Sequence, residues 1–187
     1  MDVTFYRRRL PHWQPENTDL FITWRLHGSL PKWKMHPVFV KADRYLDQAS
    51  FGPTWLRQPE IAEIVTGAIR YCATSLRHFD LLAWVIMANH VHMLVTPQAP
   101  VEKFMRTLKC FTASKANAIL GRKGEPFWQH ESYDHWVRDG RSREKIVRYI
   151  EFSPVQAGIV TRAEDYRWSS AWKGSPGLSV AQASGLR

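Results

Sequence analysis

Two kinds of hydrophobic spacing alternate along the 187 residues of this chain. Short apolar runs rich in β-branched and aromatic residues predict strands, and apolar positions three or four residues apart predict amphipathic helices. The predicted strands are residues 20–26, 79–87, 90–96 and a segment within 127–137, and the predicted helices begin near residues 59, 101 and 142. The resulting order is the βαββαβ pattern of a ferredoxin-like antiparallel sheet, followed by an added C-terminal helix. The predicted fold class is therefore α+β.

Glycine and proline residues mark the ends of several of these elements. Pro59 stands where a helix could begin. Ala88 and Asn89 can turn the chain between the two strands of a hairpin. Gly121 is well placed to end the helix of about residues 101–120, and Pro154 is expected to end or kink the last helix.

The chain shows no internal repeat and no second domain. We expect a basic N-terminal arm over residues 1–19, a single domain over residues 20–172 and a flexible tail over residues 173–187. Residues 30–58 contain several prolines and scattered aromatic residues. We interpret them as an irregular, partly helical insertion on the surface of the domain.

Two histidines stand two residues apart in the third predicted strand. Residues i and i+2 of a strand point to the same face, so the side chains of His90 and His92 are expected to project side by side. Val91, Met93 and Val95 alternate with them and are expected to face the core. Histidines at a strand end are often only half-exposed polar residues, but two parallel imidazoles can also share one divalent metal ion. The pair is therefore a candidate metal site, which we expect to lie outside the core.

The chain is basic, with 26 lysines and arginines against 17 aspartates and glutamates and a formal net charge of +9. The excess charge is clustered at the N-terminus, over residues 103–123 and over residues 138–148. Clustered positive charge suits a polyanionic partner, and nucleic acid is the first candidate. The residues expected to contact DNA phosphates are Arg7, Arg8, Arg9, Lys103, Arg106, Lys109 and Lys115.

Other features bear on where the protein works. No apolar run reaches the length of a membrane span, and the first residues lack the apolar region of a signal peptide. Two cysteines, Cys72 and Cys110, are too few for a disulfide framework. These observations favour a cytoplasmic protein with free thiols and no membrane partner.

Two tyrosines stand in chemically interesting surroundings. Tyr149 lies on the last predicted helix, one turn before Ser153 on the same face. Tyr133 is its rival, because acidic residues and a histidine surround it, but the negative charge of neighbouring Asp134 opposes formation of its phenolate. Most tyrosines on amphipathic helices simply place the ring in the core, and spacing alone does not choose between the two.

Several motifs together resemble one family. Residues 87–95, which read Met-Ala-Asn-His-Val-His-Met-Leu-Val, resemble the His-hydrophobe-His motif of the HUH single-tyrosine transposases. Residues 149–158, Tyr-Ile-Glu-Phe-Ser-Pro-Val-Gln-Ala-Gly, are similar to the catalytic-tyrosine helix of that family, commonly Tyr-Ile-x-x-Asn-Pro-Val-x-x-Gly. Residues 6–13, 127–129 and 166–170 resemble the REP-associated members, often called RAYT proteins. The resemblance covers roughly residues 5–172 in the same order.

The resemblance implies a ferredoxin-like nuclease that acts on single-stranded or hairpin DNA, as a monomer or a homodimer. It implies that His90 and His92 bind a divalent metal, Mg²⁺ or Mn²⁺ by analogy, and that Tyr149 is the nucleophile. The third ligand of the family, an Asn or Gln four residues after the tyrosine, corresponds here to Ser153, whose hydroxyl is a weaker ligand. Either the metal is held more weakly, or a water or Gln156 completes its shell. Imidazole ligands would also admit zinc or nickel.

Two other functions compete with that of a strand-transferring transposase. One is a domesticated DNA-binding protein that keeps the scaffold but cleaves poorly, which the serine at position 153 makes worth testing. The other is a zinc hydrolase or deaminase, which the absence of a Cys-x-x-Cys motif and of a His-x-Glu partner weakens.

Overall fold

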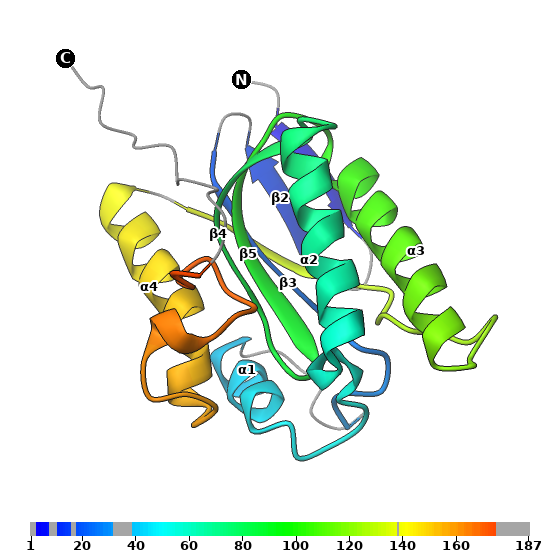
Figure 1. Ribbon diagram of the computed structural model, residues 1–187. Helices are drawn as coiled ribbons and strands as arrows, with labels where there is room; N and C mark the ends of the chain where they lie inside the picture. The colour runs from blue at the N-terminus through cyan, green and yellow to red at the C-terminus, as the bar shows by residue number, and fades with distance from the viewer. Residues whose placement is uncertain (1–2, 8–10, 16–17, 32–38, 138, 175–187) are drawn as a thin grey trace.

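The computed structural model describes residues 3–7, 11–15, 18–31, 39–137 and 139–174. At its centre lies an antiparallel sheet of four strands in the order β4-β5-β3-β6 (Figure 1). Helix α2 (Pro59–Thr74) connects β3 to β4, and helix α3 (Val101–Ile119) connects β5 to β6. The predicted βαββαβ order and ferredoxin-like sheet are confirmed. The strands are β3 (Leu20–Arg25), β4 (Phe79–Ile86), β5 (His90–Pro97) and β6 (Tyr133–Trp136).

Further elements extend this core. Strands β1 (Val3–Arg7) and β2 (Pro11–Pro15) pair as a separate two-stranded sheet within the predicted N-terminal arm. Helix α1 (Phe39–Gln48) and the short 3-10 helix η2 (Trp55–Arg57) lie within the predicted insertion, and a second 3-10 helix, η3 (Ala163–Asp165), follows helix α4 (Gly140–Gln156). None of the helices in the described part of the chain is long and apolar enough to cross a membrane.

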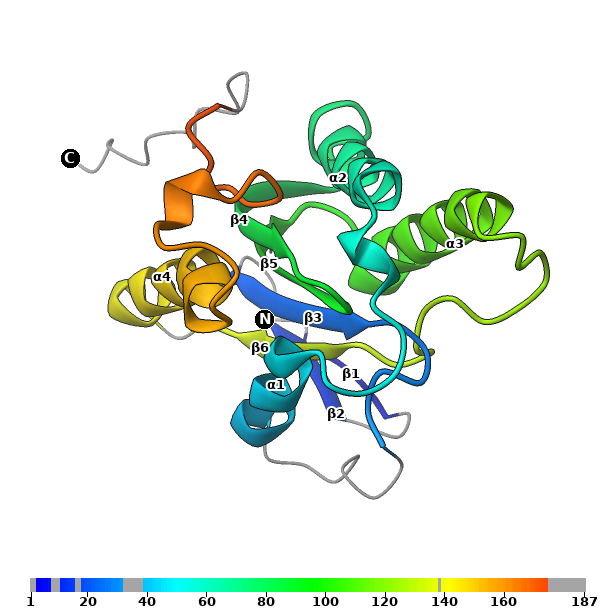
Figure 2. The ribbon, with the colours of Figure 1, turned by 60° about the horizontal axis from the view of Figure 1, so that its bottom comes forward.

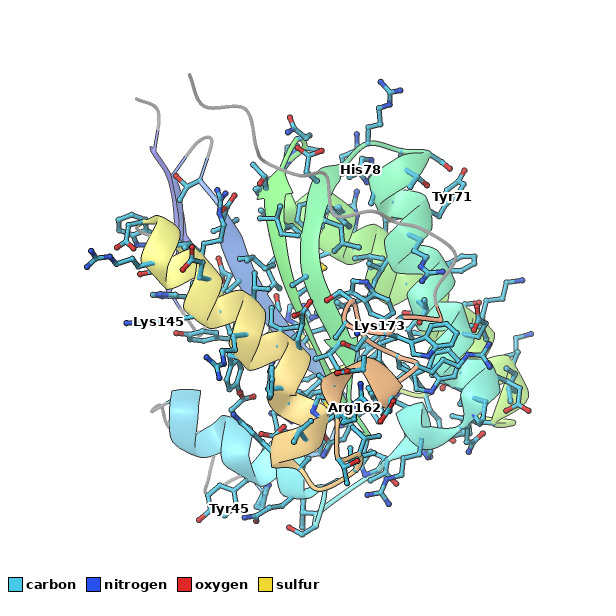
Figure 3. All side chains as sticks on the ribbon, turned by 60° about the vertical axis from the view of Figure 1, so that its left-hand side comes forward. Tyr45, Tyr71, His78, Lys145, Arg162 and Lys173 are labelled. Atoms are coloured by element: carbon cyan, nitrogen blue, oxygen red, sulfur yellow. The ribbon has the colours of Figure 1, made fainter. Side chains whose placement is uncertain are left out.

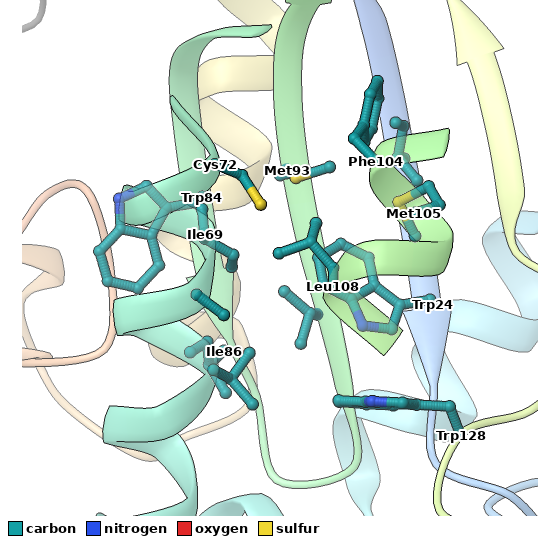
Figure 4. Close-up of a cluster of buried hydrophobic side chains, with 14 of the residues drawn as sticks. Trp24, Ile69, Cys72, Trp84, Ile86, Met93, Phe104, Met105, Leu108 and Trp128 are labelled. Atoms are coloured by element: carbon teal, nitrogen blue, oxygen red, sulfur yellow. The ribbon is translucent and has the colours of Figure 1, made fainter. Parts of the chain in front are cut away.

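Different helices cover the two faces of the central sheet (Figure 2). We call the two faces the α2–α3 face and the α1–α4 face, after the helices that cover each of them. The α2–α3 face carries the larger apolar cluster, to which Val91, Met93 and Val95 contribute as predicted. Figure 4 shows part of this cluster, in which side chains of α2, α3 and the strands interdigitate. Its largest buried members include Trp24, Ile69, Trp84, Phe104 and Leu108.

The α1–α4 face carries a smaller apolar cluster together with the two histidines. Its buried apolar side chains are Phe21, Ala83, Val85, Met87, Leu94, Val137 and Ile150. His90 and His92 are both 0% exposed, so the expectation that they lie outside the core is wrong. The reason is that helices α1 and α4 cover this face of the sheet, and the alternation of a strand does not reveal whether its second face is covered.

Helix α4 is longer than the sequence predicts. It begins after Asp139, whose side chain caps the helix by accepting a hydrogen bond of 2.8 Å from the backbone nitrogen of Ser142. Pro154 does not end the helix, which continues to Gln156. A proline has no backbone donor, so the helix continues past Pro154 without the hydrogen bond that this position would normally donate.

The segment that follows α4 covers the outer edge of β4. The backbone nitrogen of Ile86 donates to the carbonyl of Trp168 at 2.8 Å, and that of Ser170 donates to the carbonyl of Trp84 at 2.9 Å. The Ser170 hydroxyl also donates to Glu151 of α4 at 3.1 Å. The edge strand is therefore paired, and the same segment is tied to the helix that carries Tyr149.

Candidate functional site

The strand register of the sheet places the residues of the site next to one another. His90 and His92 of β5 lie opposite Arg25 and Thr23 of β3, so these four side chains share the α1–α4 face. Tyr133 of β6 lies opposite Thr23 on the other side and belongs to the same face. Residues far apart in the sequence are thus brought together by three adjacent strands.

Each imidazole is held through its Nδ1 atom. His92 Nδ1 lies 2.7 Å from Thr23 Oγ1, and His90 Nδ1 lies 2.7 Å from Asn89 Oδ1. The Asn89 oxygen can only accept a hydrogen bond, so Nδ1 of His90 carries the proton and its Nε2 atom offers a lone pair. The two Nε2 atoms lie 3.0 Å apart. Partners on the far nitrogen that fix ring orientation in this way are typical of metal-binding histidines.

Burial keeps both imidazoles neutral. It lowers the pKa of His90 to about 3, and together with the neighbouring His90 it lowers the pKa of His92 well below its usual range. A neutral imidazole is the form that ligates a metal ion. The pair is therefore ready to bind a cation at neutral pH without first losing protons.

Helix α1 brings two carboxylates to the histidines. Asp43 Oδ1 lies 3.5 Å from His92 Nε2, and Asp47 Oδ1 lies 3.5 Å from His90 Nε2. The two acids are four residues apart and so lie on one face of the helix. Figure 3 shows α1 and α4 side by side over this part of the sheet, with Tyr45 and Lys145 pointing away from it.

The carboxylates lack the hydrogen bonds that burial normally demands. Both oxygens of Asp43 and Oδ1 of Asp47 are buried without a hydrogen-bond partner among the described residues. Burial, and then the charge of Asp47, raises the pKa of Asp43 to about 8, and burial raises that of Asp47 to about 6. A buried acceptor left without a donor is costly, and a cation would remove that cost.

The residues present therefore fit a divalent metal ion. Ligand atoms of Asp43, His90 and His92 lie within 4.8 Å of one another, and all three residues are buried. Two imidazoles and one carboxylate are a common ligand set for divalent transition metals. Asp43 and Asp47 are not among the residues predicted from the sequence, because a segment with the pattern of a surface insertion gives no sign that their side chains are turned inward.

The two candidate tyrosines border the same site from different elements. Tyr149 projects from α4, and its ring centroid lies 5.6 Å from that of His92 and 6.1 Å from that of Phe21. Burial, then the charges of Asp134 and Asp43, raises the pKa of Tyr133, which opposes its phenolate as the sequence indicated. The ring of Tyr149 therefore contacts a candidate ligand, His92.

Ser153 is completely buried on α4. Its hydroxyl donates a hydrogen bond of 2.8 Å to the backbone carbonyl of Tyr149, so its proton is used within the helix. Gln156, the other residue considered for the metal shell, is exposed at the end of α4. The predicted ligand role of Ser153 stays a prediction, and Asp43 is a further candidate oxygen ligand that the sequence did not indicate.

The residues predicted to contact phosphates lie away from the histidines. Lys103, Arg106 and Lys115 are exposed on α3, on the opposite side of the sheet. The Lys109 ammonium donates to the backbone carbonyls of Gln129 and His130, at 3.1 and 3.0 Å. Arg7 lies in β1, and Arg8 and Arg9 lie outside the described residues.

Arg106 and Lys109 also line a cavity of about 540 Å³ between α3 and residues 125–134. None of the histidines or tyrosines of the site lines it. The cavity therefore belongs to the other side of the sheet.

The chain is similar to known transposases. A family model described as "Transposase IS200 like" matches residues 54–153, which include His90, His92 and Tyr149 but not Asp43. The REP-associated tyrosine transposase of Escherichia coli (strain K12) is 27% identical over 94 residues, which are 50% of this chain and 55% of that protein. The matched segment thus spans about half the length of this relative.

Two solved structures are also similar. A REP-associated tyrosine transposase bound to a REP hairpin is similar over 97% of this chain and 96% of that chain, with a TM-score of 0.60 and 20% identity. A putative transposase from Deinococcus radiodurans R1 is similar over 72% of this chain and 89% of that chain, with a TM-score of 0.42 and 18% identity. The first of these agrees with the fold described above.

Proposed function

Because the chain belongs to the family of IS200-like transposases, we propose that it is a metal-dependent enzyme that cuts and rejoins single-stranded or hairpin DNA. REP-like palindromes are the proposed substrates, since the E. coli relative is REP-associated and the similar fold was solved with a REP hairpin. One observation carries the proposal. The ring of Tyr149 lies against His92, within a cluster of two neutral imidazoles and a buried carboxylate that lacks hydrogen-bond donors.

His90, His92 and Asp43 are the proposed metal ligands, and Asp47 lies beside them as an additional carboxylate. A divalent ion bound there would polarise a phosphoryl oxygen and neutralise part of its charge. The protein itself holds the proposed ligands in fixed orientations. Thr23 and Asn89 orient the two rings, and burial keeps water from competing for the Nε2 atoms.

Tyr149 is the proposed nucleophile. Its phenol oxygen would form a bond to the phosphorus as the bond from phosphorus to the 3′ oxygen breaks, which leaves a 5′-phosphotyrosine and a free 3′-hydroxyl. The phenol proton ends, in the net reaction, on the departing 3′ oxygen. One phosphoester replaces another, so the 3′-hydroxyl of a second strand can reverse the step and become joined without ATP.

Helix α4 must hold Tyr149 over the histidines for this step. Near its start, Arg143 forms an ion pair with the buried Asp19, which also accepts a hydrogen bond of 2.6 Å from Thr96 of β5. Near its end, Glu151 accepts a hydrogen bond from Ser170. The ring contact between Tyr149 and His92 forms within one chain, which supports attack within one protomer.

The proposal is tested with a labelled DNA hairpin that carries single-stranded flanks. We expect cleavage in Mg²⁺ or Mn²⁺ and none in chelator. Tyr149→Phe removes only the hydroxyl and should abolish cleavage while hairpin binding persists, whereas the matched variant Tyr133→Phe should still cut. Cleavage by Tyr149→Phe, or equal cleavage by the wild type with and without metal, contradicts the proposal.

The alternative is a DNA-binding protein with little or no cleavage activity. The observation in its favour is the Ser153 hydroxyl, which donates to the Tyr149 carbonyl in the position where the family has an amide ligand. The same assay separates the two functions. A wild-type protein that binds the hairpin but leaves it uncut in every divalent metal is the binding protein.

A further inference from the structure

Arg25 is a charged residue at the site to which the proposed mechanism gives no role. It ends β3 and lies directly opposite His90 in the register of the sheet. Cross-strand partners place their side chains on the same face, about 5 Å apart at the Cβ atoms. The arginine is therefore the immediate neighbour of a candidate metal ligand on the α1–α4 face.

The guanidinium of Arg25 keeps most of its hydrogen-bonding capacity. It is half-buried, and burial lowers its pKa. With the residues that the structure describes, it forms one side-chain hydrogen bond, from Nη1 to Ser29 Oγ at 3.3 Å, and no ion pair. Arg143, Arg122 and Arg162, by contrast, are each paired with a carboxylate. A guanidinium has five donors, and one neutral hydroxyl leaves its charge available to an anion.

The backbone around Arg25 is fixed from several sides. Its carbonyl accepts a hydrogen bond of 2.8 Å from the nitrogen of Gln129, and the next residue, Leu26, donates to the carbonyl of Asn89 at 2.8 Å. The following turn contains Gly28 at φ +76°, and Gly52 packs so tightly against it that a Cβ atom there would lie 2.2 Å from the Gly28 oxygen. The arginine thus stands on a rigid support, which positioned catalytic groups require.

We propose that Arg25 binds a non-bridging oxygen of the scissile phosphate and stabilises the charge on that phosphate in the transition state of strand cleavage. This inference rests on the proposed function. Phosphoryl transfer develops charge on the equatorial oxygens, and an arginine aimed at them is a common source of stabilisation. The basic residues of α3 cannot take this role, because they lie on the other side of the sheet.

The proposal is tested by single-turnover cleavage of two hairpin substrates that differ only at the scissile linkage. One has an ordinary phosphate, and the other has an uncharged methylphosphonate. Arg25→Gln should slow cleavage of the ordinary substrate by about 10²- to 10³-fold, the usual effect of removing one such donor. The ratio of the two rates should shrink in this variant, because the lost group acted on the missing charge.

Arg70→Gln is the matched control, since Arg70 lies on α2 with its guanidinium 5.7 Å from the centre of the Trp84 ring. It should leave both rates and their ratio unchanged. Arg25→Lys keeps the charge and should recover part of the rate, which provides a folded variant if Arg25→Gln is unstable. Hairpin affinity of the Arg25 variants should stay within a few-fold of the wild type.

Two results overturn the proposal. Wild-type cleavage by Arg25→Gln shows that the arginine is not needed, and an equal slowing on both substrates shows that it acts only through the structure. If the wild-type protein forms no cleaved product in any divalent metal, the proposed function itself fails, and the role of Arg25 fails with it.

Discussion

The two faces of the central sheet differ in the kind of side chain that they bury. On the α2–α3 face the described side chains are almost entirely apolar and interdigitate as in an ordinary protein core. On the α1–α4 face, buried histidines and aspartates occupy positions that apolar residues would fill at less cost. The same strand, β5, supplies alternate residues to both faces. The difference indicates that one face stabilises the fold, while the other buries polar groups that fit the proposed metal site.

The largest expected effect on activity comes from a substitution on the α1–α4 face. His92→Ala should abolish metal binding and reduce cleavage by about 10³-fold or more, because the substitution removes a proposed ligand and the ring that Tyr149 contacts. Calorimetric titration with Mn²⁺ and the cleavage assay measure the two losses. A variant that still binds Mn²⁺ as the wild type does would show that the histidine is only a core residue.

The adjacent residue on the same strand tests the other face. Met93→Ala should lower the free energy of unfolding by about 2–5 kcal/mol, the usual cost of a cavity at a buried position. The folded protein should keep its affinity for Mn²⁺, since Met93 points away from the site. Urea unfolding and the same titration measure both quantities, and a large loss of metal affinity would erase the distinction between the faces.

The two aspartates of α1 should make the free energy of unfolding depend on pH. The pKa values of Asp43 and Asp47, about 8 and about 6, lie above their usual value, so the folded metal-free protein holds protons that the unfolded chain releases. The contribution of these two groups to the free energy of unfolding is therefore greatest below about pH 4. It is lost as the pH rises toward 8, by roughly 1.4 kcal/mol per unit of pKa shift. Asp43→Asn should remove much of this loss and should also weaken Mn²⁺ binding.

Urea unfolding in chelator at pH 5 and pH 8 measures this effect. Mn²⁺ at pH 8 should restore stability to the wild type more than to Asp43→Asn. If the wild type in chelator is as stable at pH 8 as at pH 5, ionising the buried carboxylates costs no stability, and no cation is needed to offset that cost.

The smallest expected effect concerns the exposed surface of α3. Replacing Lys103, Arg106 and Lys115 with glutamine should reduce the salt dependence of hairpin binding, by about 0.7 in the log–log slope for each lost contact to a single-stranded phosphate. Lys109 is left intact because its ammonium holds two backbone carbonyls. The cleavage rate at saturating DNA should not change. An unchanged slope would mean that this surface lies away from the DNA.

Alternation along β5 predicts the strand and the side-by-side placement of His90 and His92, because side-chain direction in a strand depends only on position. The burial of His90 and His92 could not be predicted in this way. It depends on α1 and α4, whose placement is a tertiary contact. Asp43 was hidden for the same reason, since two acids four residues apart on a short helix normally mark a solvated face.

The most direct test of the proposed nucleophile is to identify the residue that becomes linked to DNA. The protein is incubated in Mn²⁺ with a hairpin whose cleaved fragment diffuses away, so that the covalent intermediate accumulates, and is then digested and examined by tandem mass spectrometry. We expect a nucleotide adduct on the peptide that contains Tyr149, and this adduct should depend on Mn²⁺ and be lost in His92→Ala. An adduct on Tyr133, or an adduct that forms equally in chelator, would contradict it.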